Sequence, residues 1–356
     1  MTSGKARIGV VGAGWWSTYT HIPGLLENPD AELAGICDTN EAAVRRVAEA
    51  FPEVPTYADV GEMLQAQSLD GVVVAIPHVA HHRVATQCLD HGLHVMVEKP
   101  LTLTAADAKD LVDRAEARGV QLIVGYPWNF TRPAIRAREL LVAGALGRIE
   151  HVQCMQSSMV VEFYRGNDAA YQPIFDWTVA GPGDVYARPE LSGGGQGHLQ
   201  ITHSSGLMFF VTGLRAARVT ALMSSLDVPV DVVNAMTVEF DGGALGVIGG
   251  TGNIPVGDEG VLTVHVYCEQ GYVLLDAIRG TLVVHRHEGP NIEGQVEEGY
   301  EYPRFDTANN LVDVCCGHAT NGSPGEVGLR SVEMLDAAYR SADRDGAMVG
   351  VSELYV

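Results

Sequence analysis

The pair Glu98-Lys99 occupies a position from which a side chain could do chemistry. The apolar run at residues 94–97 predicts a β-strand, and Pro100 fixes the turn that follows the pair. A Glu-Lys pair is ordinarily a solvated surface ion pair. At the carboxyl edge of a parallel sheet, however, a lysine points into the crevice where open α/β sheets bind their ligands. We therefore expect Lys99 to donate a hydrogen bond to a substrate oxygen.

A glycine-rich turn near the start of the chain predicts a dinucleotide site. Residues 8–17 read Ile-Gly-Val-Val-Gly-Ala-Gly-Trp-Trp-Ser, which predicts a strand, a tight turn and a helix N-terminus. Glycine lets the backbone approach a ligand closely, and free N–H groups at a helix start attract phosphate. Because Ser17 replaces the third glycine of the G-x-G-x-x-G motif, the motif alone is weak. The apolar run 31–37 strengthens it, since this run ends in Asp38, where a Rossmann unit places the carboxylate that binds a ribose diol.

Asp38 also predicts the choice of cofactor. A carboxylate accepts a hydrogen bond from a ribose 2′-hydroxyl and repels a 2′-phosphate, which favours NAD over NADP. Arg45 and Arg46 lie almost two turns into the next predicted helix, so their spacing makes them poor partners for a phosphate. A buried strand at residues 71–76 brings further polar side chains to the same sheet edge, although capping histidines in a loop are an alternative. The expected cofactor contacts are Gly12, Ala13, Gly14, Trp15, Trp16, Asp38, Pro77, His78, His81, Glu98 and Lys99.

The composition limits the class of partner. The chain has 23 Lys and Arg against 44 Asp and Glu, and its net charge of −21 argues against binding to nucleic acid or an anionic membrane surface. No signal peptide or membrane span is evident, so we expect a cytoplasmic protein with a small substrate. The six cysteines lack C-x-x-C spacing and are expected to be free thiols, with no metal site at residues 315–318.

The chain resembles the Gfo/Idh/MocA family, the relatives of glucose–fructose oxidoreductase and inositol dehydrogenase. The resemblance covers nearly the full length and rests on the glycine turn, Asp38, Pro77 to His81, the block Gly92, His94 and Glu98-Lys99-Pro100, residues 136–147, Gly193-Gly194-Gly195 ahead of His203, and residues 324–330. It implies an α/β Rossmann domain over residues 1–125. It also implies an α+β domain with a large open, mostly antiparallel sheet over residues 126–356, which binds substrate and forms oligomers.

The second half of the chain is compatible with this fold. Short turns such as residues 241–243 and 279–280 predict hairpins. The stretch 288–299, rich in glycine and glutamate, predicts an exposed loop. The strand-like runs are residues 219–223, 232–240, 244–248, 262–268, 272–275 and 282–285.

The resemblance implies that Lys99 and His203 flank the carbon that exchanges hydride with nicotinamide. Oxidation of a secondary alcohol needs a base for the hydroxyl proton and a cation that stabilises the developing alkoxide. Many members of the family carry an aspartate four residues before this histidine and another three after it, where this chain has Leu199 and Gly206. Without the carboxylate we expect His203 to be a weaker base, with Gln200 available to hold its ring. The alternative is a histidine that only packs in the domain interface.

Two further stretches predict substrate contacts. Residues 162–191 combine aromatic and arginine side chains among glycine and proline, which suits a polyhydroxylated ring, although a long surface loop is equally compatible. Residues 126–129 lie at the domain junction, where they line or pack the nicotinamide side. The expected substrate contacts are Lys99, Trp128, Asn129, Tyr186, Arg188 and His203.

We therefore expect an NAD(H)-dependent oxidoreductase that acts on a ring secondary hydroxyl of a sugar, glycoside or cyclitol. Inositol itself is less favoured because the carboxylate is missing at Leu199. Two alternatives stay open: a redox-assisted lyase or glycosidase that recycles NAD, and a regulator that senses the cofactor without turnover. Since a broad half-buried sheet needs a cover, we also expect a homodimer or homotetramer.

Overall fold

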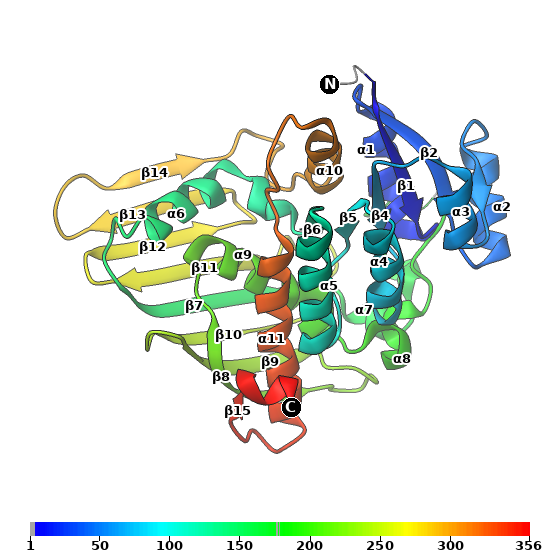
Figure 1. Cartoon of the computed structure of the whole chain (residues 1–356). Coiled ribbons are helices and arrows are strands. Elements are labelled where there is room, and N and C mark those ends of the chain that lie inside the picture. Colours follow the sequence, from blue (N-terminus) through cyan, green and yellow to red (C-terminus); the bar gives the residue numbers. More distant parts are fainter. Residues whose placement is uncertain (1–3, 176, 178) are drawn as a thin grey trace.

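A computed structural model describes residues 4–175, 177 and 179–356 and contains two sheets that lie side by side (Figure 1). The first sheet is entirely parallel and has the strand order β3-β2-β1-β4-β5-β6. Its strands are β1 (Ala6–Val11), β2 (Ala31–Cys37), β3 (Thr56–Tyr57), β4 (Gly71–Val74), β5 (His94–Val97) and β6 (Leu122–Val124). The sequence GVVV of β4 is fully buried, as expected for a strand covered on both faces.

Helices whose ends are set by local sequence connect these strands. Asn40 caps α2 by accepting hydrogen bonds from the N–H groups of Ala42 and Ala43, and Thr104 caps α5 in the same way. Gly119 ends α5 in the left-handed conformation. The segments are η1 (Ser17–His21), α1 (Ile22–Glu27), α2 (Glu41–Ala50), α3 (Val60–Ala66), η2 (His78–Ala80), α4 (His81–Asp90) and α5 (Ala105–Arg118).

The second sheet has nine strands in the order β14-β13-β12-β11-β7-β10-β9-β8-β15. All neighbours are antiparallel except β7 and β10. The expected fold class is thereby confirmed. The strands are β7 (Ile149–Ser157), β8 (Ala216–Ser224), β9 (Val233–Phe240), β10 (Leu245–Thr251), β11 (Val261–Cys268), β12 (Gly271–Asp276), β13 (Thr281–Arg286), β14 (Ile292–Gln295) and β15 (Val349–Gly350).

Helices cover one face of this sheet. Side chains alternate between buried and exposed along β9 and β11, and the buried set packs under α6, α9 and α11 (Figure 1). The segments of this half are η3 (Pro127–Phe130), α6 (Arg132–Val142), α7 (Val161–Tyr164), η4 (Asp168–Tyr171), η5 (Val185–Ala187), α8 (Pro189–Ser192), η6 (Gly197–Ile201), α9 (Thr202–Thr212), α10 (Asp306–Cys316), α11 (Gly325–Ala342) and η7 (Val351–Tyr355).

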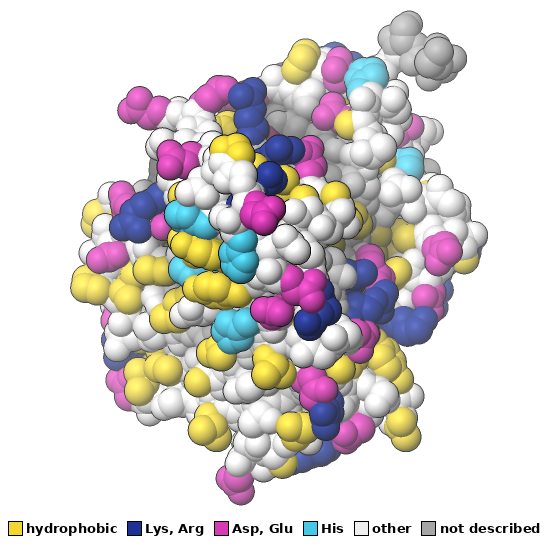
Figure 2. Space-filling view, turned by 90° about the vertical axis from the view of Figure 1, so that its left-hand side faces the viewer, with side chains coloured by type: hydrophobic (Ala, Val, Ile, Leu, Met, Phe, Trp, Pro, Cys, Tyr) yellow, Lys and Arg dark blue, Asp and Glu magenta, His cyan; other side chains and the backbone are white. Residues whose placement is uncertain are grey.

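The opposite face of the nine-stranded sheet carries exposed apolar side chains. On the side of the molecule that carries this sheet, hydrophobic and histidine side chains gather together (Figure 2). The exposed apolar residues of the sheet strands on this outer face are Met155, Leu222, Leu245, Val247, Val261 and Tyr267.

Two details differ from the sequence-based expectation. Residues 288–299 are not one continuous loop, because β14 pairs with β13 through backbone hydrogen bonds that the side-chain composition does not reveal. In addition, α10 packs against β1, β4 and β5 of the first sheet, with Leu311 and Val312 in its core. A helix from the second half of the chain thus covers part of the first sheet. Residue 125 therefore stays a proposed boundary between the two domains.

Four of the six cysteines are buried and the other two partly buried, and all six are free thiols. Within the described part of the chain, no helix combines the length and apolar character needed to cross a bilayer.

Candidate functional site

A cavity of about 1200 Å³ lies between the two sheets. It is lined by the loops that follow β1, β2, β4 and β5, by the end of β7, and by the junction of η6 and α9. This is the edge of the first sheet at which parallel α/β sheets bind ligands.

The glycine turn after β1 is shaped for close approach. Gly12 has a φ of +111°, and a Cβ at this position would lie 2.0 Å from the carbonyl oxygen of Ala75. A side chain there would separate β1 from the end of β4. Gly14 lines the cavity, and a Cβ on it would have no protein atom within 4 Å. The turn therefore packs closely against the backbone after β4 at Gly12 and leaves open space at Gly14.

Asp38 is fixed beside this turn. Its Oδ2 accepts a hydrogen bond from the N–H of Ala13 at 2.8 Å, and its Oδ1 accepts one from the N–H of Asn40 at 2.8 Å. A carboxylate held next to an open glycine turn matches the donor set that binds the ribose and pyrophosphate of a dinucleotide. The residues present thus fit NAD.

Arg46 lies closer to this end of the cavity than its spacing in the sequence indicates. It lines the cavity together with Asp38, Asn40 and Ala43, whereas Arg45 pairs with Glu41 on the exposed face of α2. Arg46 is three residues after Ala43, so the helical period places both on the face of α2 that looks into the cavity.

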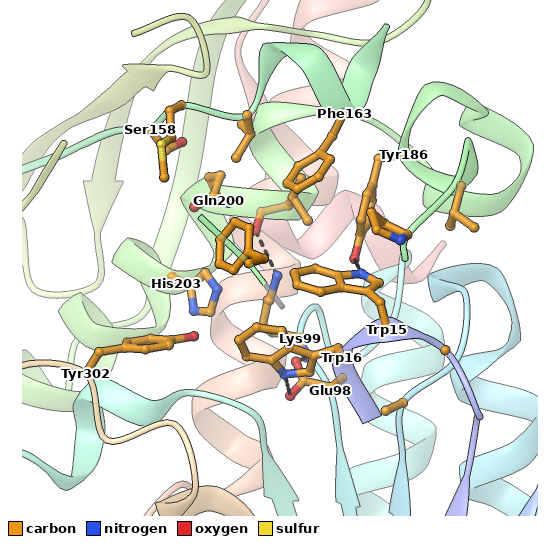
Figure 3. A pocket seen from close by; sticks show the side chains of 18 of the residues that line it. Trp15, Trp16, Glu98, Lys99, Ser158, Phe163, Tyr186, Gln200, His203 and Tyr302 are labelled. Carbon is orange, nitrogen blue, oxygen red and sulfur yellow. Dashed lines mark hydrogen bonds between the residues drawn. The ribbon is translucent and has the colours of Figure 1, made fainter. Parts of the chain in front are cut away.

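A buried carboxylate lies beneath Lys99. Oε1 of Glu98 accepts a hydrogen bond from Nε1 of Trp16 at 3.0 Å (Figure 3). It also accepts one from Nε2 of His21 at 2.9 Å, and Oε2 accepts one from the N–H of Lys99 at 3.1 Å. Burial alone raises the pKa of a carboxyl group. The hydrogen bond and charge of His21 and the charge of Lys99 outweigh it, so that the pKa of Glu98 is lowered. Glu98 therefore keeps its negative charge.

The ammonium group of Lys99 points across the cavity to the second domain. Its Nζ donates a hydrogen bond to the backbone carbonyl of Leu199 at 3.0 Å (Figure 3). Leu199 belongs to the π-helical segment η6, and π-helical turns are frequent at functional sites. The position that lacks the family aspartate therefore still contacts the lysine, through its main chain. Burial lowers the pKa of Lys99 to about 8, although the charge of Glu98 opposes this.

His203 lies in the first turn of α9 and also lines the cavity. Its ring packs edge-on against Trp128, with the ring centroids 5.3 Å apart. Burial and then the charge of Lys99 lower the pKa of His203 well below its ordinary value, so the ring is neutral at pH 7. Among the described residues its buried Nδ1 has no hydrogen-bond partner, which leaves Nε2 as the nitrogen that faces the cavity.

The expected role of Gln200 is wrong. Its Oε1 accepts a hydrogen bond from Nε2 of Gln156 at 2.9 Å, and Oε1 of Gln156 accepts one from the N–H of Ser204 at 3.1 Å. Gln200 is thus tied to β7 and not to the ring of His203. Aromatic packing, not a hydrogen bond, orients the imidazole.

Gly206 replaces the second family aspartate for a steric reason. A Cβ on Gly206 would lie 2.7 Å from Cζ of Tyr126. The hydroxyl of Tyr126 in turn pairs with the hydroxyl of Thr202 at 3.1 Å. The phenol occupies the space that a side chain at position 206 needs.

Most of the expected contact residues come together at the cavity. Ala13, Gly14, Trp15, Trp16, Asp38, Pro77, His78, Glu98, Lys99, Trp128, Tyr186 and His203 all line it. Four do not: Gly12 lies beneath the turn, and His81, Asn129 and Arg188 point elsewhere. The ring nitrogens of His81 lie within 3.0 Å of the carbonyls of Pro100 and Ile76, Asn129 donates to Ser323, and Arg188 pairs with Glu190.

The sequence did not indicate several side chains that line the cavity. Tyr302 lies between β14 and α10, and its ring centroid is 4.8 Å from that of Trp128. Gln156 lies at the end of β7, where the alternation of the strand predicts only that it points inward. No local motif marks these positions. Within residues 4–175, 177 and 179–356, no three His, Cys, Asp or Glu side chains are grouped so that they could hold a metal ion.

Comparison with family models identifies both halves of the chain. Residues 6–126 match the oxidoreductase family with an NAD-binding Rossmann fold, and residues 134–274 match the GFO/IDH/MocA C-terminal domain. The chain belongs to the Gfo/Idh/MocA family. Its first domain is an NAD-binding Rossmann domain, in agreement with the fit of the glycine turn and Asp38.

Curated relatives within the Gfo/Idh/MocA family are matched over part of their length. The chain is 32% identical over 149 residues to 1-carboxy-3-chloro-3,4-dihydroxycyclohexa-1,5-diene dehydrogenase of Comamonas testosteroni, which is 42% of this chain and 37% of that protein. It is 30% identical over 149 residues to D-glucoside 3-dehydrogenase of Escherichia coli, 42% of each chain. It is 34% identical over 152 residues to inositol 2-dehydrogenase 1 of Saccharopolyspora erythraea, 42% of this chain and 45% of that one. The matches span less than half of these relatives.

Two solved structures match this chain over its whole fold. GenD2 from gentamicin A biosynthesis, solved in complex with NAD, has a TM-score of 0.76 and 26% identity, and the match covers 98% of this chain and 97% of that one. Levoglucosan dehydrogenase, solved with NADH and levoglucosan, has a TM-score of 0.77 at 17% identity and covers 98% and 99%. At 17% identity, the similarity to levoglucosan dehydrogenase shows only that the two proteins share a fold.

Proposed function

We propose that the protein is an NAD(H)-dependent dehydrogenase that oxidises a ring secondary hydroxyl of a sugar, glycoside or cyclitol, or reduces the corresponding ketone. One observation carries the proposal. The ammonium of Lys99 and the neutral imidazole of His203 line the same cavity as Asp38 and the glycine turn, although they come from different domains. Relatives whose names specify a glucoside and an inositol support this substrate class.

The two side chains have complementary roles in alcohol oxidation. A neutral ring can accept a proton, so Nε2 of His203 takes the hydroxyl proton of the substrate. The charged Lys99 donates a hydrogen bond to the same oxygen and stabilises the negative charge that develops there. Bound NAD supplies the hydride acceptor, and Asp38 with residues 13–16 would hold it.

Substitution of each side chain tests this assignment. We expect Lys99→Ala and His203→Ala each to lower kcat by about a hundredfold or more, the usual scale for a positioned acid or base. NADH affinity, measured by fluorescence titration, should change little, because neither side chain belongs to the glycine turn or to Asp38. Near-normal turnover in Lys99→Ala would contradict the mechanism, and loss of NADH binding would point to a structural role.

The assay also separates the proposed activity from a redox-assisted lyase. A dehydrogenase forms one NADH for each product molecule, whereas a lyase that recycles NAD forms product without net NADH. Sugars, glycosides and inositols are therefore screened by measuring both the product and the absorbance of NADH. Equal amounts of product and NADH indicate a dehydrogenase, and product without NADH indicates a lyase.

We further propose that two copies of the chain pair through the outer face of the nine-stranded sheet. Exposed apolar side chains such as Leu245 and Val247 lie on this face, 53% and 51% exposed. Contiguous apolar surface of this kind is typical of an interface.

A further inference from the structure

One side of the cavity is a continuous aromatic surface, the aromatic wall, formed by Trp15, Phe163, Phe175 and Tyr186. The ring centroid of Trp15 is 5.7 Å from that of Phe175 and 6.0 Å from that of Phe163. The rings of Phe163 and Tyr186 are 5.7 Å apart. The four rings come from the glycine turn, from α7 and from the segment between η4 and α8, so the fold assembles this wall from separate parts of the chain.

The aromatic wall has few polar atoms to offer a ligand. Nε1 of Trp15 donates to the hydroxyl oxygen of Tyr186 at 3.3 Å, so the indole N–H is satisfied within the wall and the tyrosine O–H is the donor that the wall keeps for a ligand (Figure 3). This pairing also fixes the two rings. A sugar hydroxyl placed against the ring faces would lose hydration without gaining a partner from them, whereas a flat apolar ring would stack on them.

The arginines that line the cavity are not placed to bind an anionic group at the wall. Among the described lining residues, the arginines are Arg46 and Arg279. Arg46 lies beside Asp38, at the end expected to hold the adenosine, and Arg279 is paired with Asp276 at 3.0 Å. A phosphate or carboxylate on the substrate would therefore lack a guanidinium partner at the wall.

The wall and the reacting groups face the same space. Figure 3 shows Lys99 between Trp15 on one side and His203 with Tyr302 on the other. A ring whose hydroxyl reaches Lys99 and His203 can extend a substituent toward Trp15 and Phe163. Gln200 also lines the cavity, and its amide N–H groups can donate to the hydroxylated part of the substrate while its oxygen stays bonded to Gln156.

We propose that the substrate is a neutral ring alcohol with an aryl substituent, such as an aryl glycoside, and that the aromatic wall binds the aryl group. This proposal rests on the proposed function for the reacting ring. It specifies the rest of the substrate: a flat apolar substituent in place of a phosphate, a carboxylate or a second sugar.

Matched pairs of glycosides test the proposal. For glucose, galactose and xylose, phenyl and methyl glycosides are compared as substrates of the enzyme with NAD. We expect the phenyl member of the preferred pair to have a kcat/KM at least about tenfold higher, because a pocket built for an apolar group discriminates by that order. Phe175→Ala and Phe175→Leu should each reduce this ratio several-fold, since both remove the ring face. Ile174→Ala, whose side chain is exposed and does not line the cavity, should keep it.

A binding measurement separates this proposal from the proposed function. In Lys99→Met saturated with NAD, calorimetry measures the affinity for the same glycosides without turnover. Tighter binding of phenyl than of methyl glycosides, lost in Lys99→Met/Phe175→Ala, supports the aromatic wall even if no glycoside is oxidised, a result that would overturn only the proposed activity. Equal affinity within every pair, or absence of binding, overturns the aryl proposal.

Discussion

At the scale of single residues, the site depends on Lys99, whose pKa is shifted in opposite directions by burial and by a neighbouring charge. Burial lowers the pKa of Lys99, and the charge of Glu98 beneath it counteracts that effect. Glu98 in turn stays ionised because the hydrogen bond and charge of His21 and the charge of Lys99 outweigh its burial and lower its pKa. These contacts make Glu98 a positioning residue that acts through Lys99.

The pKa of Lys99, about 8, predicts an alkaline limit to activity. The charged form is present below this pKa and is lost as the pH rises through it, so carbonyl reduction should decline above about pH 8. Lys99→Arg, which stays charged, should lack this decline even if its rate is lower. In Glu98→Gln the decline should move to lower pH, since the charge that raises the lysine pKa is gone. A profile of kcat against pH that is unchanged in Glu98→Gln would contradict this coupling.

The pH profile of alcohol oxidation has an acid limb set by His203. Because burial lowers the pKa of His203 below its ordinary value, the neutral base persists as the pH falls through 6.5. Alcohol oxidation should therefore hold its rate at pH 6.5 and decline only at lower pH. A midpoint at 6.5 or above in the wild type would show that the base is a different, more solvated group.

At the scale of elements, the glycine turn after β1 has two separable functions. Gly12 permits the contact between β1 and the end of β4, whereas Gly14 leaves space for the ligand. We expect Gly12→Ala to lower Tm by about 5 °C or more, because the new Cβ clashes with a backbone carbonyl and the positive φ disfavours alanine. Gly14→Ala should leave the Tm of the ligand-free protein nearly unchanged.

NAD binding separates the two glycine variants. Gly14→Ala should weaken NAD by about tenfold or more, since its Cβ projects toward the pyrophosphate position. Calorimetric titration with NAD and a thermal melt of each variant measure the two effects. If Gly14→Ala bound NAD normally, the dinucleotide would not approach this turn.

Two π-helical segments place the groups at the reacting end of the cavity. The segment η1 carries His21 to Glu98, and η6 carries the carbonyl of Leu199 to Lys99. Each follows a glycine-containing turn of one domain, and both meet at the Glu98-Lys99 pair. The two π-helical segments carry neither Lys99 nor His203, but their contacts fix the positions of Glu98 and Lys99.

At the scale of the whole molecule, the outer face of the nine-stranded sheet is the surface through which we propose that two copies pair. A charge buried in such an interface is costly, so Val247→Glu should shift the protein to monomer in light scattering at micromolar concentration. Val142→Glu on α6 provides a matched control, because Val142 is 56% exposed and Val247 51%. A wild-type protein that is already monomeric, or a Val247→Glu variant that still pairs, would contradict the proposed interface.

The architecture and both catalytic candidates could be predicted from the sequence, His203 and the second domain through the family resemblance. The glycine turn, the buried run of β4 and the Glu98-Lys99-Pro100 block are local patterns, because strand period, turn chemistry and the end of a strand are set by near neighbours. The expected pair Lys99 and His203 lines one cavity, as the resemblance implied.

The contacts that hold these groups could not be predicted from the sequence. Gln200 is bonded to Gln156, the backbone carbonyl of Leu199 accepts a hydrogen bond from Lys99, and Tyr302 lines the cavity from a distant loop. A π-helical turn alters which side chains share a helix face, and backbone carbonyls are the same in every sequence. The assembly of the aromatic wall from three separate segments likewise depends on how distant parts of the chain pack, which no local pattern records.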